Sequence, residues 1–546
     1  MTESLTSLRQ EERTLVESRA WKQPYAAWSP IARKRHDGTM FDVTPFLKVY
    51  AGFRSFVLQT RDPVDTQAWV LKGLIRRAEM TRFGQHHGFS DIADVRDFQR
   101  RVPLRHYEDF WREYWQPDFP RLVDCTWPGV IPYFARTSGT TAGMSKYIPC
   151  SDDMIAANLR AGEDLFVFHV LNHPQSQVLA GKCLLLGGST DLAEEAPGIW
   201  SGDLSGIEAR EIPTWRRSWI FPPLELALIP DWEEKIEKIA IACLVEDIRA
   251  ISGAPNWLLL FFDKLAQLRP GAGGLATVFP RLELIIHGGI PFTPYRDRFW
   301  HLLEGTNAET REAYMASESS IAVADHADGE GLRLICDDGT FYEFVPVAEL
   351  EHAEPTRHWL ANIETGIEYA VIVSTCAGVW AYILGDTVRL IDRDPPRLIV
   401  TGRTSYLLSA FGEHVIAEEI EQAIRSAATA IGAAVVDYSV GVLFPDTDKV
   451  GMHFYIVEFA DSVPDAAGMS TFTHTLDRVL AELNADYHER RTGDFGLLLP
   501  RVEAVRPGTF AAWMKRRGKL GGQHKVPRVI NDAKLFANLC DFAANH

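Results

Sequence analysis

A loop rich in hydroxyl groups and glycine directly follows the apolar segment VIPYFAR in this chain of 546 residues. The loop spans residues 137–146 and reads TSGTTAGMSK. Its backbone amides and hydroxyls can surround the oxygens of a phosphate group, and Lys146 adds a counter-charge. It is not a Walker A loop, because Met144 and Ser145 stand where that pattern needs glycine and lysine. Such a segment alone is more often a surface turn, so the phosphate hypothesis depends on the motifs that follow it.

Three further motifs follow in a fixed order. The first, Tyr314 to Glu318, ends an apolar strand with a hydroxyl and a carboxylate that can meet a metal-bound nucleotide. The second, YILGD, ends another strand, where Asp386 is placed to accept hydrogen bonds from ribose hydroxyls. The third begins at Gly402 and Arg403, where the chain passes from one expected domain to the next.

Each of these residues also has a simpler interpretation. Asp386 could begin a turn, and Glu318 could cap the start of the next segment, since acids favour helix N-termini. Gly288 and Gly289, after the apolar run LELIIH, could form an ordinary turn at the end of a strand. We expect His287 to bond a backbone partner rather than to act in acid–base chemistry.

The four motifs together resemble the adenylate-forming superfamily of acyl-CoA synthetases, luciferases and nonribosomal-peptide adenylation domains. Serine before Glu318, LSAFGEHV after the Gly-Arg pair and GGQHKVPR near the C-terminus resemble one branch in particular. This branch is the auxin-responsive Gretchen Hagen family of acyl acid amido synthetases. The resemblance covers about Trp127 to Arg528, most of the chain.

The resemblance implies a role for each matching residue. The loop would cradle the ATP phosphates, Gly288 and Gly289 would contact adenine, and Asp386 and Arg403 would lie near the ribose. Catalysis would depend on Lys146, on Glu318, which also helps to hold Mg²⁺, and on Lys525, for which Lys519 is a rival. The expected ATP-binding residues are Thr137, Ser138, Gly139, Thr140, Thr141, Gly143, Gly288, Gly289, Tyr314, Ser317, Asp386 and Arg403.

The activity implied is the ATP-dependent adenylation of a small carboxylic acid, followed by acyl transfer to an amine, most simply an amino acid. Attack of one anion on another requires Mg²⁺ and cationic side chains. A carboxylate–CoA ligase and a non-catalytic nucleotide-binding regulatory protein are the alternatives. The presence of all the charged motif residues argues against a decayed site. The identities of the acid and the amine stay open.

Strands that alternate with helices predict an α/β fold. We expect a large N-terminal domain, residues 1–401, in which an antiparallel or barrel-like sheet packs beside α/β layers. A smaller mobile α+β domain, residues 402–546, would carry the hinge and Lys525. Within these domains we predict a helix from Trp232 to Ile251, a strand pair reversing near Gly378, and a helix from about Ile416.

The composition of the chain disfavours several classes of partner. The net charge of −17 disfavours nucleic acid and anionic lipid. Seven scattered cysteines without a CxxC pair predict neither a disulfide framework nor a cysteine zinc site. The charged N-terminus does not look like a signal peptide, and the apolar runs are too short to span a bilayer. We therefore expect a soluble, cytoplasmic protein of undetermined oligomeric state.

Overall fold

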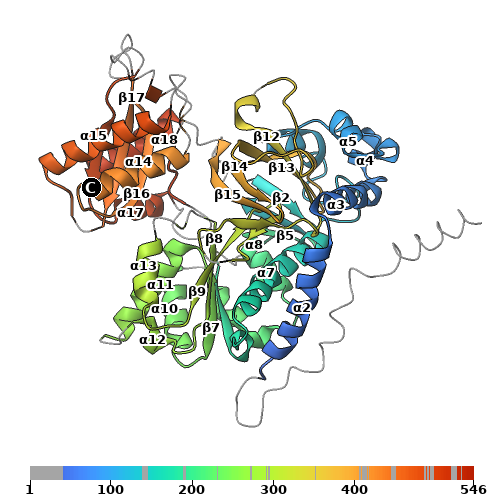
Figure 1. Ribbon diagram of the computed structural model, residues 1–546, viewed down its shortest axis with the longest axis horizontal. Helices are drawn as coiled ribbons and strands as arrows, with labels where there is room; N and C mark the ends of the chain where they lie inside the picture. Colours follow the sequence, from blue (N-terminus) through green and yellow to red (C-terminus); the bar gives the residue numbers. More distant parts are fainter. Residues whose placement is uncertain are drawn as a thin grey trace, which may run out of the picture.

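The computed structural model divides the chain into a large α/β part and a smaller C-terminal unit, drawn in orange to red in Figure 1. It describes residues 41–137, 146–187, 192–229, 232–270, 274–289, 292, 295–326, 328–350, 352–404, 408, 415, 417–443, 451–460, 462–484, 487–488, 491, 497–517, 525–530 and 532–545.

One sheet of eleven strands forms the centre of the large part. Its strand order is β12 (Thr340–Pro346), β13 (Glu368–Thr375), β14 (Tyr382–Arg393), β15 (Pro396–Arg403), β11 (Leu332–Leu334), β10 (Ser320–Val323), β9 (Glu309–Met315), β8 (Leu284–Gly288), β7 (Ile248–Gly253), β3 (Lys182–Leu186) and β6 (Ile220–Phe221). Strands β9, β8, β7, β3 and β6 run parallel to one another. The other six strands, from β12 to β10 in the order given, each pair antiparallel with their neighbours. The antiparallel strands therefore continue the parallel sheet edge to edge, and do not pack beside it as expected.

A second sheet holds the strand that precedes the hydroxyl-rich loop. Its order is β2 (Lys146–Cys150), β1 (Tyr133–Thr137), β5 (Ile199–Gly202) and β4 (Ala193–Ala196). The segment VIPYFAR thus forms a strand, as predicted, but outside the large sheet.

Helices cover the large part on several sides. They are α2 (Thr44–Thr60), α3 (Pro63–Ala78), α4 (Arg82–His86), α5 (Val95–Arg101), α6 (Tyr107–Phe110), α7 (Asp152–Asn172), α8 (Leu204–Glu211), α9 (Leu224–Ala227), α10 (Trp232–Cys243), α11 (Pro255–Leu268), α12 (Leu275–Val278) and α13 (Arg296–Leu303). None of the helices within the described residues is long and apolar enough to cross a membrane.

The helix predicted from Trp232 to Ile251 is wrong in its second half. Helix α10 ends at Cys243, and β7 begins at Ile248. Strand β7 is hydrogen-bonded between β3 and β8, and Ile248, Ala250 and Ile251 are buried there. A short apolar run fits a buried strand or a helix equally well, so the neighbouring strands decide the outcome.

The strand pair predicted around Gly378 is confirmed. Strands β13 and β14 pair antiparallel, and Gly378 lies in the turn between them with φ +92°. A Cβ atom at this position would lie 2.8 Å from Thr126 Oγ1, so both the backbone conformation and the space favour glycine.

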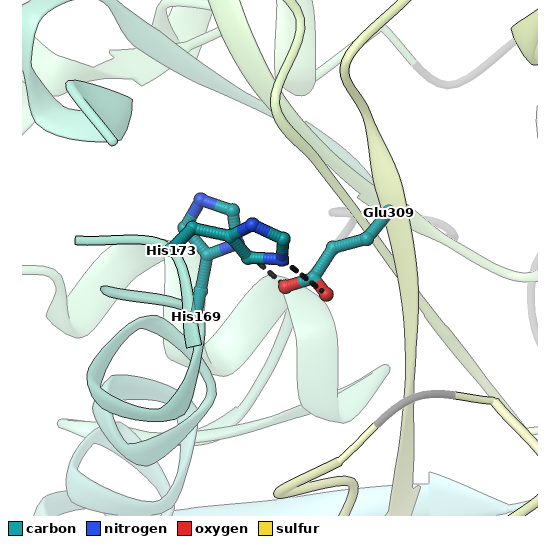
Figure 2. A group of neighbouring side chains, drawn as sticks. All are labelled: His169, His173 and Glu309. Carbon is teal, nitrogen blue, oxygen red and sulfur yellow. Dashed lines mark hydrogen bonds and ion pairs between the residues drawn. The ribbon is translucent and has the colours of Figure 1, made fainter. Parts of the chain in front are cut away.

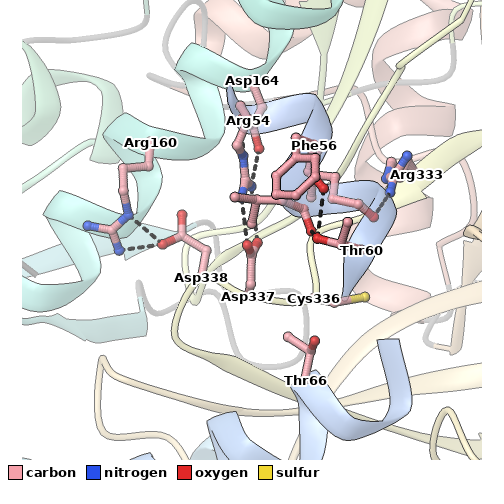
Figure 3. Close-up of polar contacts among 12 residues, drawn as sticks. Arg54, Phe56, Thr60, Thr66, Arg160, Asp164, Arg333, Cys336, Asp337 and Asp338 are labelled. Carbon is pink, nitrogen blue, oxygen red and sulfur yellow. Dashed lines mark hydrogen bonds and ion pairs between the residues drawn. The ribbon is translucent and has the colours of Figure 1, made fainter. Parts of the chain in front are cut away.

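Helix α2 is fastened to the large part by a buried ion-pair network, shown in Figure 3. Arg54 donates to both oxygens of Asp164 on α7 at 2.8 and 2.6 Å. It also bonds Asp337, between β11 and β12, at 2.5 and 3.0 Å. One guanidinium thus joins three segments that are far apart in the sequence.

The C-terminal unit is a three-stranded sheet with helices on both faces. The strands are β16 (Val435–Leu443), β17 (Met452–Phe459) and β18 (Arg501–Val505), and the helices are α14 (Ala417–Ala430), α15 (Ala466–Leu483), α17 (Thr509–Arg516) and α18 (Ala533–Ala544). Side chains alternate along β17, so that Tyr455 and Val457 pack toward α14 and α15 while Phe454 and Ile456 pack toward α17 and α18. The helix predicted from about Ile416 is confirmed as α14. The domain division at residue 402 stays a prediction, and it falls within the last residues of β15.

Candidate active site

The hydroxyl-rich loop is carried by the hairpin of β1 and β2. Thr137 and Lys146 are paired across the two strands, so the loop begins and ends at one point. The predicted phosphate ligands Ser138, Gly139, Thr140, Thr141 and Gly143 lie outside the described residues. The Lys146 ammonium lies 5.2 Å from the centre of the Tyr107 ring and 4.0 Å from Glu108 Oε1.

Tyr314 and Asp386 meet although they come from different motifs. The Tyr314 hydroxyl, near the end of β9, donates a hydrogen bond of 2.8 Å to Asp386 Oδ2 on β14. Tyr314 is buried and Asp386 is half-buried. Two of the predicted ATP-site residues are thereby brought together.

Glu318 lies beside this pair in the loop between β9 and β10, where it is buried. The Tyr382 hydroxyl donates to its carboxylate, and the charges of Asp386 and Lys146 act on it. Burial raises the pKa of Glu318 above its ordinary value, because the charged form loses water; Asp386 adds to this, while Tyr382 and Lys146 oppose it. Residues from the hydroxyl-rich loop, from Tyr314–Glu318 and from YILGD therefore converge, although YILGD begins β14 and does not end a strand as expected. Ser317 lies half-buried next to Glu318 in the same loop.

A buried amide supports the Glu318 loop, and the sequence interpretation missed it. Asn158 Oδ1 on α7 accepts hydrogen bonds from the Ser320 backbone N–H at 3.1 Å and from the Ser320 hydroxyl at 2.9 Å. Its Nδ2 donates to Glu208 Oε1 on α8 at 3.0 Å. Burial raises the pKa of Glu208 to about 7. No local pattern around residue 158 distinguishes it from other polar helix residues, so the sequence carries no signal for this role.

Gly288 and Gly289 lie where β8 ends. A Cβ atom on Gly288 would come within 2.1 Å of the Ala313 carbonyl oxygen on β9, so this position needs glycine. Gly289 has φ +79°, and the Lys525 ammonium lies 3.7 Å from where its Cβ would be. The structure therefore places Lys525 of the C-terminal unit against the glycine pair of the large part.

The expected backbone partner of His287 is not found. His287 is buried, and neither of its ring nitrogens has a hydrogen-bond partner within the described structure. Burial lowers the pKa of His287 to about 3, so the imidazole is neutral at ordinary pH. Its ring stacks on Phe292 with 3.7 Å between ring centres. Packing, rather than a backbone bond, holds this side chain.

Gly402 and Arg403 are the last two residues of β15. Arg403 is the cross-strand neighbour of Asp386, although its side chain lies outside the described part. A Cβ on Gly402 would lie 3.3 Å from Ala417 Cβ at the start of α14. Glycine here allows the helix to approach the strand closely.

A second contact joins the two parts of the chain near Lys525. Arg528 donates to the Tyr295 hydroxyl of the large part, and it also pairs with Glu421 on α14. Burial raises the pKa of Tyr295 to about 12. Neither Tyr295 nor Arg528 was predicted to join the two parts. Arg528 lies in a segment rich in Lys and Arg, which is the one sequence signal for its role.

Comparison with known proteins places these features in one family. The chain matches the GH3 family N-terminal domain over residues 52–247, the GH3 family central domain over 333–403 and the GH3 family C-terminal domain over 418–534.

Relatives and a solved structure agree with this match. The chain is 29% identical to the probable indole-3-acetic acid-amido synthetase GH3.9 of Oryza sativa subsp. japonica, over 39% of this chain and 53% of that protein. Over 86% of this chain and 90% of the relative, it is 25% identical to the indole-3-acetic acid-amido synthetase GH3.4 of Arabidopsis thaliana. The solved GH3.15 acyl acid amido synthetase has the same fold, with a TM-score of 0.73 at 16% identity over 87% of this chain and 93% of that one. The match with some relatives thus spans about half of their length.

Proposed function

Because this chain belongs to the GH3 family, we propose that it is an ATP-dependent acyl acid amido synthetase. It adenylates a small carboxylic acid with an apolar body and then joins the acyl group to an amine, in our proposal an amino acid. The observation that carries the proposal is the convergence of Tyr314, Glu318 and Asp386 beside Lys146. They come from separate parts of the chain: Lys146 ends the hydroxyl-rich loop, Tyr314 and Glu318 share one motif, and Asp386 belongs to YILGD.

In the first step, a carboxylate oxygen of the acid attacks the α-phosphorus of ATP. The bond from this phosphorus to the bridging oxygen breaks, pyrophosphate leaves, and acyl-AMP remains. Both reactants are anions, so positive charge is needed where the new bond forms. We assign this charge to Lys146 and to Lys525, which reaches the large part at Gly289.

In the second step, the amine nitrogen attacks the acyl carbonyl. The bond between the acyl carbon and the phosphate oxygen of AMP breaks, and AMP leaves. An amide bond forms, and the amine nitrogen loses a proton. Acyl-AMP reacts readily with water, so the contact between the two parts at Tyr295 and Arg528 supports a role in closing the site.

The nucleotide is held, in this proposal, by residues on both sides of the cluster. Asp386 and Arg403 contact the ribose, which agrees with their position as cross-strand neighbours. Gly288 and Gly289 present backbone to the adenine, and the loop from Thr137 to Gly143 surrounds the phosphates. Tyr314 orients Asp386 through its hydroxyl.

The carboxylate of Glu318 fits a magnesium ligand. It is buried beside a second carboxylate, and burial disfavours its charge unless a cation is near. Oxygen donors of this kind are the ligands that Mg²⁺ prefers. When bound, Mg²⁺ neutralises phosphate charge, while Tyr382 holds the carboxylate in position.

Pyrophosphate release tests the proposal. The protein is incubated with ATP, Mg²⁺ and each member of a panel of aryl and alkyl carboxylic acids, with an amino-acid mixture, with CoA, or with neither. We expect release to depend on a particular acid, and an amide to form when amino acids are present. Thioester formation driven by CoA would instead identify a carboxylate–CoA ligase. ATP binding without release by any acid would point to a nucleotide-binding regulatory protein.

A further inference from the structure

Two histidines at the end of α7 face a glutamate at the start of β9, as Figure 2 shows. His169 Nδ1 lies 2.6 Å from Glu309 Oε1, and His173 Nε2 lies 2.9 Å from Glu309 Oε2. The backbone N–H of His173 bonds the His169 carbonyl at 2.8 Å, which keeps the two imidazoles on one side of the helix. Among the described residues, this is the one group of three His, Cys, Asp or Glu side chains with ligand atoms all within 4.8 Å.

We propose that His169, His173 and Glu309 form a binding site for Zn²⁺, with water completing a tetrahedral set of ligands. Two imidazole nitrogens and a carboxylate oxygen are a common zinc ligand set. Mg²⁺ and Ca²⁺ prefer oxygen ligands alone, so they fit this group poorly. The His173 side chain is 48% exposed, which leaves solvent access for the water ligand.

The groups around the three ligands hold them in the orientation that zinc needs. His169 Nε2 lies 3.0 Å from the Ser176 hydroxyl and 3.7 Å from Glu283 Oε2. These acceptors favour the tautomer with the proton on Nε2, which leaves the lone pair of Nδ1 for the ion. Arg311 Nε donates to Glu309 Oε1 at 2.6 Å, which orients the carboxylate and leaves Oε2 toward His173. Outer hydrogen bonds to a histidine and to a carboxylate ligand are typical of zinc sites.

The spacing of the ligand atoms suits the ion after a small movement. Zinc bonds nitrogen and oxygen at about 2.0–2.2 Å, so neighbouring ligands in a tetrahedron lie roughly 3.3–3.5 Å apart. The present contacts of 2.6 and 2.9 Å are slightly shorter than this, and all the atoms lie within 4.8 Å. Rotation of the exposed His173 side chain is enough to admit the ion. Arg311 is the charge that opposes the ion most directly; it bonds Oε1, so Oε2, which faces His173, is the oxygen left for the ion.

The proposed zinc site is separate from the candidate active site. Glu309 is the first residue of β9, and Tyr314 lies five residues further along the strand. At about 3.3 Å per residue, the two are about 17 Å apart. Zinc would therefore tie α7 to β9 at the end opposite Glu318. We expect an effect on stability rather than on the chemical step.

Titration of the full-length, untagged protein with Zn²⁺ after chelator treatment tests this inference. Calorimetry should give one site per chain for the wild type. His173→Ala removes a solvent-exposed ligand and should weaken binding at least about 100-fold. His301→Ala is the matched control, because His301 also faces a glutamate, Glu304, at 3.0 Å on the surface. The control should bind as the wild type does.

Two further readouts distinguish this site from others. Co²⁺ in place of Zn²⁺ should give tetrahedral absorption without a thiolate band in the wild type, and this absorption should be lost in His173→Ala. Zn²⁺ should raise the melting temperature of the wild type and of His301→Ala, but not of His173→Ala. Wild-type affinity in His173→Ala, a thiolate band, or the lack of a wild-type site would each overturn the proposal.

Discussion

The Tyr314 hydroxyl bonds the Asp386 carboxylate at 2.8 Å across 72 residues of sequence. This bond joins the end of a strand in the parallel half of the large sheet to a strand in its antiparallel half. Because the two halves form one sheet, the motifs that they carry share one site.

Loss of this bond should weaken nucleotide binding. Tyr314→Phe removes a hydrogen bond to a charged group, which contributes about 1.5–3 kcal/mol, so we expect ATP affinity to fall about tenfold or more. Asp386→Ala should weaken it further. Tyr487→Phe is the control, because it removes an equivalent bond of 2.7 Å to Asp477 in the C-terminal unit. Equilibrium titration with ATP measures all three, and unchanged affinity in Asp386→Ala would remove the ribose assignment.

Lys525 should act on the reaction rather than on ATP binding. Lys525→Ala removes the ammonium group near Gly289, and loss of such a charge typically lowers the rate about 10²–10³-fold. We expect this fall in acid-dependent pyrophosphate exchange, with ATP affinity little changed. Lys534→Ala, on the exposed face of α18, is the control. If Lys519→Ala shows the loss and Lys525→Ala does not, the role belongs to Lys519.

Glu318 should contribute to activity at the expense of stability. Burial raises its pKa, so folding disfavours the charged carboxylate relative to the unfolded chain. Glu318→Gln should therefore raise the melting temperature while it lowers Mg²⁺-dependent pyrophosphate release. A variant that is less stable than the wild type at pH 8 would contradict this account.

Glu208 should make the stability depend on pH. Its pKa rises from 4.5 to about 7 on folding, because of burial first of all. Because folding raises this pKa, the contribution of Glu208 to the free energy of unfolding is fully present below pH 4.5. That contribution is lost as the pH rises through 7. Glu208→Gln should thus melt a few degrees above the wild type at pH 8, and close to it at pH 5. Glu482→Gln, an exposed change, should give the same small difference at both pH values.

Arg54 should be essential to the fold. Arg54→Met leaves the buried carboxylates of Asp164 and Asp337 without their shared partner, and breaking a buried pair in this way costs about 3–5 kcal/mol. Arg112 also faces two carboxylates, but its side chain is 64% exposed and solvent screens the pairs, so Arg112→Met should lower the free energy of unfolding far less. Urea unfolding of both variants measures the difference; equal losses would show that burial is not the cause.

Local patterns predicted most of the elements and the candidate residues. Phe472, Leu476, Val479 and Leu480, for example, recur at helical spacing, and these side chains are buried on α15. The strand end at Tyr314 is predicted from a short apolar run followed by polar residues, and β9 does end at Met315. The strand end expected at Asp386 is wrong, because β14 continues to Arg393 by pairing with β15. Such signals are local, because periodicity and turn residues are set by neighbouring positions along the chain.

Local sequence patterns failed to predict features that depend on contacts between segments far apart in the sequence. The sequence from Trp232 to Ile251 fits one helix, and the pairing of Ile248–Gly253 with β3 and β8 makes its end a strand. Asn158 is an ordinary helix residue until Ser320 and Glu208 lie against it. His169 and His173 have a recognisable spacing, but Glu309 joins them only through the packing of α7 near β9.

The amino-acid sequence by itself therefore determined the family and the order of the motifs, and it indicated a class of chemistry, because residue types and spacing carry these signals. The tertiary structure alone decided that Tyr314 holds Asp386, that Lys525 reaches Gly289, and that two histidines share a glutamate. These contacts join residues that are far apart in the chain. They arise from the burial of apolar surface, which brings the sheet and helices together without a local signal.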